Sequence, residues 1–317
     1  MEYRKLIKFG NSSHVVSLPK AWTEKNNLKK GDTIYLEENG NNELILTKEK
    51  NNIKIPFKKI TIDITRKDNK PIQREIVSAY VGNYRQIIII GDNLNERADF
   101  IRETLHNFIA LEIIEQTNDR IVAKDFLNIS KIDASGLIKR IDIIIRSMIF
   151  DVKNCSNNCS ICDDLLRRDK DVNRLVFLIY RLCKYYMAYP HVLAHKKETI
   201  NFYLKVWSIA ENMEKIGDEI KRIAKLICNE PVEKELEGRL INLLNDIERF
   251  YSNALKAYYN YDVQLACALD QVNKLLIVKL RDSVEWRKAT MEQHLLIEKF
   301  HNAIELIHRI SKVVSYV

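Results

Sequence analysis

The sequence predicts a multidomain protein with three parts: a small β-rich domain at residues 1–50, a small α/β connecting module at residues 51–128 and an all-α bundle at residues 129–317. Three observations support this division. Short apolar runs separated by turn residues fill the first part, a pattern typical of tight β-hairpins. In the second part, β-rich runs alternate with helical spacing of apolar residues. Beyond Asp133 the apolar residues recur almost only at helical spacing, which indicates a helix bundle.

The composition is that of a folded protein. Hydrophobic residues make up 46% of the chain and charged residues 30%, which excludes intrinsic disorder as its main state. The charged start Met1–Lys5 does not resemble a signal peptide, and no apolar run is long enough to span a membrane, so we expect a cytoplasmic protein. In that compartment the six cysteines are not expected to form a disulfide framework. A net charge of +8 fits an anionic partner such as DNA, although solvated lysines also produce positive charge.

The first fifty residues are predicted to form four short strands and one helix. The strands are residues 4–9, 13–18, 33–38 and 43–47, and the helix runs from residue 19 to about residue 27. Gly10-Asn11 and Gly31-Asp32 supply two of the turns. A segment of this size buries little surface alone, so we expect it to dimerise and to bury further surface against a second chain.

Three sequence blocks in this segment carry a resemblance to a known family. They are Lys8-Phe9-Gly10-Asn11-Ser12, Val15-Val16-Ser17-Leu18-Pro19-Lys20 and Leu28-Lys29-Lys30-Gly31-Asp32-Thr33-Ile34. The segment resembles the AbrB, MazE and SpoVT group of swapped-hairpin domains, in which two chains interleave their strands into one DNA-binding β-barrel. The resemblance implies a homodimer formed through this barrel.

The same resemblance implies that basic and polar residues near the first hairpin face DNA. These residues are Arg4, Lys5, Lys8, Asn11, Ser13 and His14. Lysine and arginine neutralise phosphates, while asparagine and serine can bond to base edges or phosphate oxygens. The alternative is that these residues only solubilise a dimerisation module, because some barrels of this shape bind protein partners.

The connecting module is predicted to contain four strands and two helices. The strands are residues 60–64, 86–90, 110–116 and 120–124, and the helices are residues 72–81 and 95–108. The module has no phosphate-binding glycine loop, no catalytic-looking carboxylate pair and no HExxH motif. We therefore predict a connecting or dimerising role for it.

Six helices are predicted in the C-terminal part, at residues 133–152, 160–187, 197–229, 233–260, 263–284 and 290–315. Apolar residues form a stripe on the second of these helices: Leu165, Val172, Val176, Ile179 and Cys183. Two internal similarities indicate a duplicated three-helix unit, with repeats at about residues 131–229 and 233–316. The segment DVNRL at 171–175 resembles QVNKL at 271–275, and EKIGD at 214–218 corresponds to EKFHN at 298–302.

Two helices of this bundle resemble the PhoU phosphate-uptake regulators. The resemblance is carried by Arg168-Asp169-Lys170-Asp171-Val172-Asn173-Arg174-Leu175 and by residues 211–224, which contain Glu-x-x-x-Asp. It extends from about residue 130 to the C-terminus. It implies a bundle that binds metal through carboxylates and takes part in the control of phosphate uptake, so phosphate-transport or signalling proteins are further candidate partners.

The predicted metal ligands of the bundle are Asp169, Asn173, Glu211, Glu214 and Asp218. Glu211, Glu214 and Asp218 lie on one helical face, and Asp169 and Asn173 lie one turn apart on the expected partner helix. Oxygen donors from facing helices suit a divalent or iron-type metal. The family pattern has a carboxylate where Asn173 stands, and the second repeat lacks most of these ligands, so only one site is expected.

An alternative interpretation needs no metal. In it the three acidic residues of the third helix form an exposed stripe whose charges are paired by basic neighbours on the same helix. Those neighbours are Lys215, Lys221 and Arg222.

Cys155, Cys159 and Cys162 form a C-x3-C-x2-C motif in a polar loop between the first two predicted helices. Three thiolates with a fourth ligand can bind zinc or an iron–sulfur cluster, and we keep this as the alternative to unligated thiols. The remaining cysteines fall among apolar residues of predicted helices, where we expect buried side chains: Cys183, Cys228 and Cys267.

The expected function is that of a dimeric DNA-binding transcriptional regulator of phosphate uptake, with the helical bundle as sensor or partner-docking domain. The alternative is a modulator of a phosphate transporter that does not bind DNA and uses the barrel only for assembly. No serine, cysteine or histidine constellation supports nucleophilic catalysis, so we do not predict an enzyme.

Overall fold

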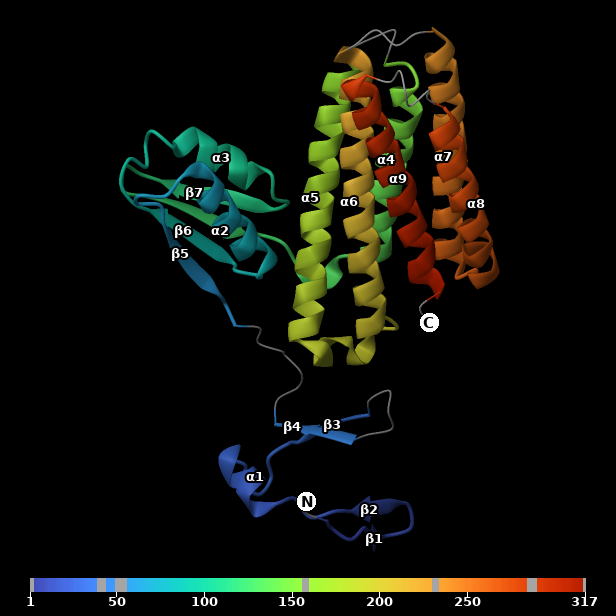
Figure 1. Cartoon of the computed structure of the whole chain (residues 1–317). Helices are drawn as coiled ribbons and strands as arrows, with labels where there is room; N and C mark the ends of the chain where they lie inside the picture. Colours follow the sequence, from blue (N-terminus) through green and yellow to red (C-terminus); the bar gives the residue numbers. More distant parts are fainter. Residues whose placement is uncertain are drawn as a thin grey trace. The chain divides into compact units, whose positions relative to one another are not determined.

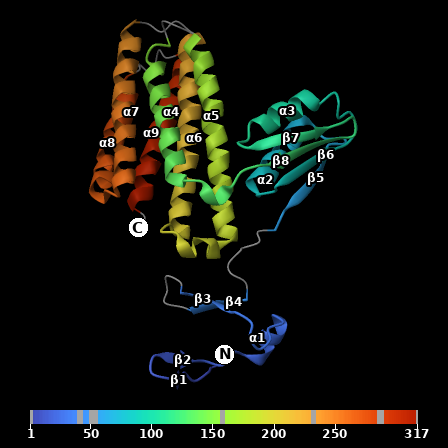
Figure 2. The ribbon, with the colours of Figure 1, turned by 180° about the vertical axis from the view of Figure 1, so that it is seen from behind.

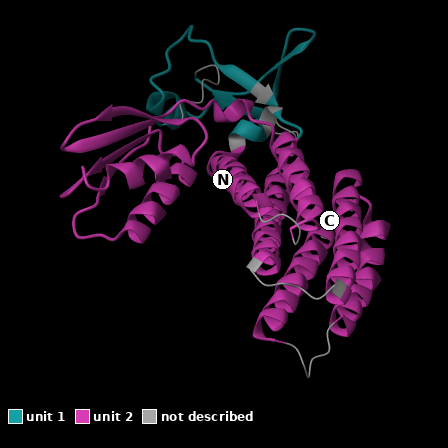
Figure 3. Ribbon diagram, turned by 90° about the horizontal axis from the view of Figure 1, so that it is seen from above, with its two compact units in different colours: residues 1–56, 191–197 teal, residues 57–190, 198–317 magenta. Residues whose placement is uncertain are grey.

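The computed structural model describes residues 3–38, 44–48, 56–155, 160–229, 234–283 and 290–315 (Figure 1). The chain divides into two compact units, which Figure 3 shows in two colours. Unit 1 comprises Met1–Pro56 with His191–Lys197, and unit 2 comprises Phe57–Pro190 with Glu198–Val317. The α/β module and the helix bundle therefore belong to the same unit. Among the described residues, no helix combines the length and apolarity that crossing a membrane requires.

The N-terminal segment forms two separate antiparallel hairpins and a short helix. Its elements are β1 (Ile7–Phe9), β2 (Ser13–Val15), α1 (Lys20–Lys25), β3 (Tyr35–Glu38) and β4 (Leu44–Thr47), with β1 paired to β2 and β3 paired to β4. The first two strands are shorter than predicted because the ladder extends only from Ile7–Val15 to Phe9–Ser13. The predicted swapped-hairpin barrel requires strands from a second chain and stays a prediction.

Unit 2 begins with a four-stranded sheet and two helices. In chain order these are β5 (Lys59–Asp63), α2 (Asn69–Val81), β6 (Gln86–Ile90), α3 (Ala98–His106), β7 (Leu111–Gln116) and β8 (Arg120–Asp125). The strand order is β5-β6-β8-β7, with β5 and β6 parallel and the other neighbours antiparallel. Because a parallel pair needs a crossover, α2 carries the chain from β5 to β6. The predicted α/β module is confirmed.

One face of this sheet is buried against α2 and α3. Ile87 and Ile89 on β6 lie opposite Ala123 and Ile121 on β8, so all four buried side chains point to the same face. The two helices add buried side chains to the same core: Ile72, Ile76, Tyr80, Ile101 and Leu105. Asp125 lies two residues beyond Ala123 on β8 and therefore continues this buried face.

The rest of unit 2 is a bundle of long helices (Figures 1 and 2). The long helices described there are α4 (Ala134–Val152), α5 (Ser160–Ala188), α6 (Ile200–Asn229), α7 (Lys234–Asn260), α8 (Val263–Asp282) and α9 (Met291–Ser315). Two short 3-10 helices also occur along the chain, η1 (Ile129–Lys131) and η2 (Pro190–His195). The long helices agree with the predicted ranges to within three residues at each end, so the helical bundle is confirmed.

The helix packing explains why these segments are helical. α6 packs against α9, α4 and α5 pack against α6, and α7 and α8 pack against α9, which gives two sets of three helices. The apolar stripe predicted on α5 is fully buried. Two N-caps fix helix starts, since the carboxylates of Asp133 and Asp262 accept hydrogen bonds from the backbone N–H of Ser135 and Leu265, both at 2.9 Å.

Candidate functional site

The first hairpin holds most of the residues predicted to face DNA. Lys8 lies directly opposite His14 in the β1–β2 ladder, and Asn11 lies in the turn between the strands. Arg4 and Lys5 precede β1. All six predicted residues are exposed, so each is accessible to a partner. The assignment of DNA contacts to them remains a prediction.

The pleat of this hairpin separates a basic face from an apolar face. Opposite residues of an antiparallel pair point to the same side, so Lys8 and His14 share one face. Phe9 lies opposite Ser13, and Ile7 lies opposite Val15, which places these four on the other face. Ser13 therefore lies away from Lys8 and His14, and the six residues do not form one continuous surface within a single chain.

No side chain is buried among residues 3–36, 38 and 44–48 of the N-terminal segment, for which burial is described. Many large apolar side chains are exposed there: Tyr3, Leu6, Ile7, Phe9, Val15, Val16, Tyr35, Leu36, Leu44 and Ile45. Phe9 is 70% exposed and Leu36 is 62% exposed. Isolated two-stranded hairpins are at best marginally stable in water, and clustered exposed apolar side chains mark an interaction surface. The segment thus has the chemistry of a surface that a second chain covers.

The carboxylates predicted to bind metal surround a lysine instead. The Lys221 ammonium on α6 donates to Asp169 Oδ2 on α5 and to Asp218 Oδ1 on its own helix, both at 2.6 Å. Burial lowers the pKa of Lys221, but its hydrogen bonds to the two carboxylates outweigh this effect and raise the pKa overall. Lys221 is therefore charged and supplies the cation between Asp169 and Asp218.

The other acidic residues of α6 lie around this pair. Glu211 is paired with Lys215 at 2.6 Å, and Asp218 also accepts from Arg222 at 3.3 Å. These pairings are the ones that the metal-free interpretation predicts. Burial raises the pKa of Glu214, and the neighbouring carboxylates of Asp218 and Asp169 add to this effect.

Two oxygens of the predicted ligand set lack a hydrogen-bond partner among the described residues. They are Asp169 Oδ1 and Asn173 Oδ1, one helical turn apart on α5. Asn173 also lines a cleft of about 170 Å³ with Lys170 and Arg174 on α5 and with Thr104 on α3. Unpartnered oxygens suit a metal, but no three of the predicted carboxylates lie close enough to share an ion in the described part of the chain. The carboxylate metal site remains a prediction.

Comparison with known proteins assigns two segments of the chain. Residues 7–54 match the family described as antidote-toxin recognition MazE, bacterial antitoxin, and residues 138–227 match the PhoU domain family. The chain joins an N-terminal MazE/AbrB-type domain to a C-terminal PhoU domain. The first suggests DNA binding and the second suggests regulation of phosphate uptake. Both families are regulatory and neither is an enzyme family.

A solved structure is also similar to the chain. The crystal structure of PhoU from Pseudomonas aeruginosa superimposes with a TM-score of 0.45 at 15% sequence identity, covering 57% of this chain and 90% of that chain. No curated protein sequence matches the chain. The domain assignment therefore rests on the two family matches.

The cysteine motif gains a partner from a distant helix of the PhoU bundle. Cys155, just beyond α4, and Cys162, in the first turn of α5, lie beside Cys228 in the last turn of α6. Cys159 lies outside the described residues. The expectation of a buried side chain at Cys228 is wrong, because this cysteine is only partly buried, and its Sγ lies 2.9 Å from Cys162 Sγ.

The other two cysteines differ from each other. Cys183 is fully buried on α5, as expected, and burial raises the pKa of its thiol to about 12. Cys267 on α8 is exposed, so the expectation of burial there is wrong. It lies next to Ala266, which faces the core, and adjacent positions on a helix point in different directions.

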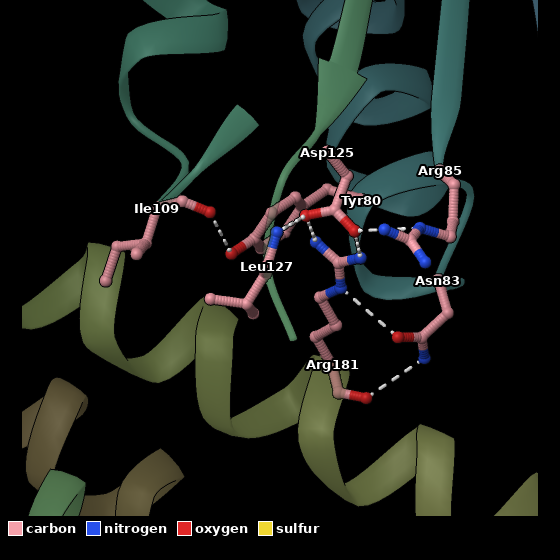
Figure 4. Close-up of polar contacts among 7 residues, drawn as sticks. All are labelled: Tyr80, Asn83, Arg85, Ile109, Asp125, Leu127 and Arg181. Atoms are coloured by element: carbon pink, nitrogen blue, oxygen red, sulfur yellow. Dashed lines mark hydrogen bonds and ion pairs between the residues drawn. The ribbon is translucent and has the colours of Figure 1, made fainter. Parts of the chain in front are cut away.

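A buried ion pair that sequence analysis missed links the α/β module to the PhoU bundle (Figure 4). Arg181 on α5 donates to both oxygens of Asp125, from Nη1 to Oδ1 at 3.0 Å and from Nη2 to Oδ2 at 2.6 Å. Both side chains are about 98–99% buried, with exposed fractions of 2% and 1%. Such a bidentate geometry is the strongest form of arginine–carboxylate contact.

Further contacts satisfy the remaining polar groups of this pair (Figure 4). Arg181 Nε donates to Asn83 Oδ1 at 3.2 Å, and Asn83 Nδ2 donates to the Arg181 carbonyl at 3.0 Å. The guanidinium also lies over the Tyr80 ring, 4.6 Å from its centroid. Asp125 accepts from the Leu127 backbone N–H at 3.0 Å. The only sequence signal for this link is an arginine within the apolar run of α5.

Proposed function

We propose that this protein is a dimeric, cytoplasmic transcriptional regulator that binds DNA through its MazE/AbrB-type domain and regulates phosphate uptake. The observation that carries the proposal is the first hairpin, which exposes a basic face with Lys8 and His14 and an apolar face with Ile7 and Phe9. A second copy covers the apolar face, and the basic faces of the two copies then approach DNA phosphates.

The PhoU bundle acts in this proposal as the sensor or as the docking domain for a transport or signalling partner. Its connection to the α/β module supports this role, because the buried Arg181–Asp125 pair joins the two parts of unit 2. A change in the bundle is thereby transmitted to the module that follows the DNA-binding segment in the chain.

Chromatin capture with and without phosphate in the growth medium tests the whole proposal. We expect enrichment near phosphate-transport genes that changes with phosphate supply. Equal recovery of those genes and of unrelated regions in both media would contradict it.

The second candidate is a modulator of a phosphate transporter that uses the N-terminal segment only for assembly. The exposed apolar face of the hairpin favours it equally, since that face requires a chain to cover it but not DNA. The two candidates differ in one property. Phosphate contacts produce a DNA affinity that falls steeply with salt, and assembly alone produces none.

Metal binding by the PhoU bundle is a separate proposal. Asp169, Asn173, Glu211, Glu214 and Asp218 would hold a divalent or iron-type ion only after the Lys221 ammonium leaves its position between Asp169 and Asp218. A metal and this ammonium therefore compete for the same carboxylates. Replacing Lys221 tests the competition, as described below.

A further inference from the structure

Three cysteine side chains from separate elements converge at one end of the PhoU bundle. Cys155 lies three residues beyond the end of α4, Cys162 is the third residue of α5, and Cys228 is the penultimate residue of α6. Their Sγ atoms all lie within 4.8 Å of one another. Because Cys228 is 66 residues from Cys162 along the chain, tertiary packing brings them together.

This cluster is distinctive in the described part of the chain. No other group of three or more histidine, cysteine or carboxylate side chains there lies close enough to share one metal ion. Cys155 is fully buried, and the other two cysteines are partly buried. A shielded set of thiols from the first turn of α5, the last turn of α6 and the turn after α4 is the donor chemistry that zinc prefers.

The sulfur spacing distinguishes between one ion and a larger cluster. With a Zn–S bond of about 2.3 Å and tetrahedral geometry, neighbouring sulfurs lie about 3.8 Å apart. All three pairs lie within 4.8 Å, and the Cys162–Cys228 pair, at 2.9 Å, has to widen by about 0.9 Å to reach that spacing. A cluster of two or four irons distributes its cysteine ligands over different irons, so three thiolates do not all lie this close together. The spacing therefore favours a single ion.

The local backbone also favours a cation. α4 and α6 both end at this point, and the carboxyl ends of helices carry partial negative charge. The Cys228 thiol lies 3.4 Å from the carbonyl oxygen of Cys155, and the Cys155 thiol lies 3.9 Å from that of Asp151. Three bare thiolates would be repelled by these carbonyls, whereas a bound divalent ion reduces the net charge of the three thiolates from −3 to −1.

We propose that Cys155, Cys162 and Cys228 bind one zinc ion, which joins the ends of α4, α5 and α6. Binding replaces three S–H bonds with three Zn–S bonds and releases three protons to solvent, with no change in oxidation state. A fourth ligand completes the tetrahedron, supplied by water or by a further side chain. Zinc binding at this site does not require DNA binding, so the two proposals can be tested independently.

Cobalt titration of the reduced, metal-free full-length protein tests the site. Co²⁺ in a tetrahedral thiolate site gives intense visible bands and sulfur-to-metal charge-transfer bands. We expect these bands to saturate at one equivalent and to disappear when Zn²⁺ is added. Cys155→Ser and Cys228→Ser should each lower Co²⁺ affinity at least ~10-fold, in line with the loss of one ligand. Cys267→Ser, which replaces an exposed cysteine on α8, should bind as the wild type does.

Two further measurements keep the result interpretable if a variant fails to fold. Zinc added to the wild-type protein should protect Cys162 and Cys228 from alkylation by N-ethylmaleimide, read by mass spectrometry, and should leave Cys267 reactive. Cys159→Ser then identifies the fourth ligand: weaker binding assigns it to Cys159 and unchanged binding assigns it to another group, and both results retain the three-cysteine site. Reduced wild-type protein that shows no charge-transfer bands, or a folded Cys228→Ser variant with undiminished bands, would overturn the proposal.

Discussion

The N-terminal segment and unit 2 differ in how far their apolar side chains are exposed to solvent. In the described residues of the segment, every apolar side chain is at least partly exposed, and Phe9 is 70% exposed. In unit 2, α/β and helical elements bury a large apolar core, and even the charged pair of Arg181 and Asp125 is withdrawn from water. Unit 2 therefore builds a core within one chain, whereas the described residues of the segment do not, and in our proposal a second copy supplies the missing cover.

The largest expected loss of unfolding free energy results from a substitution inside unit 2. Asp125→Ala leaves the Arg181 guanidinium buried without its carboxylate, and breaking a buried pair in this way costs about 3–5 kcal/mol of unfolding free energy. Urea unfolding followed by circular dichroism measures it. The double variant Asp125→Leu, Arg181→Leu should recover much of the loss, because it leaves no buried charge unpaired.

Asp99→Ala is the matched control for this experiment. It removes the carboxylate of an exposed pair with Arg102, 3.1 Å apart, on the surface of α3. We expect a loss below about 1 kcal/mol, because an exposed pair and a carboxylate in the first turn of a helix both contribute little. Equal destabilisation by Asp99→Ala and Asp125→Ala would refute the special role of the buried link.

The next largest effect is a weaker dimer, caused by a substitution in the N-terminal segment. Phe9→Ala removes a large exposed side chain from the apolar face of the hairpin, and burying such a side chain contributes roughly 1.5–3 kcal/mol. Because both copies lose this side chain, the dissociation constant of the dimer should rise by about 100–10,000-fold in sedimentation experiments. The urea transition of unit 2 should stay unchanged. Phe126→Ala, at a 59% exposed position of unit 2, should leave the dimer intact.

A smaller effect is expected at the carboxylate cluster. Lys221→Met leaves the buried Asp169 carboxylate without its ammonium partner, which costs about 1–3 kcal/mol. If the cluster can hold a metal, the same variant should bind Mn²⁺ more tightly than the wild type, as measured by calorimetry. Lys215→Met, which alters an exposed pair with Glu211, is the control. No Mn²⁺ binding by either variant would remove the metal proposal.

The smallest effect concerns cysteine reactivity and leaves stability untouched. Burial raises the pKa of Cys183 to about 12, so its thiol stays protonated at pH 8 to 9 and is a poor nucleophile. Brief iodoacetamide treatment of the native protein at pH 8 should modify exposed Cys267 and leave Cys183 unmodified in the mass spectrum. Comparable labelling of both cysteines would show that the Cys183 thiol is readily exposed to solvent, contrary to this prediction.

The sequence predicts the parts of this molecule that follow from local periodicity. The helices of the bundle are predictable because apolar side chains recur every three or four residues, as on α5 from Leu165 to Cys183. Contacts across long stretches of sequence are not predictable in this way. Arg181 and Asp125 are 56 residues apart, and their pairing depends on how α5 packs on the sheet.

The candidate sites illustrate the same limit. The C-x3-C-x2-C motif is visible in the sequence, but Cys228 joins it only because α6 ends beside α5. For the acidic residues of α6, spacing alone allows both a metal site and pairing with lysine. The position of Lys221 between Asp169 and Asp218 is a consequence of packing between two helices.

The central claim is that the segment pairs with a second copy and presents its basic face to DNA. Fluorescence anisotropy of full-length protein with duplex DNA, measured over a range of salt concentrations, tests it most directly. We predict a linear fall of log affinity with log salt, and a slope reduced by roughly 1–2 in Lys8→Ala, because each copy loses about one phosphate contact. Lys139→Ala, which replaces an exposed lysine of α4, should keep the wild-type slope. Absence of binding at low salt, or identical slopes for Lys8→Ala and the wild type, would contradict the account.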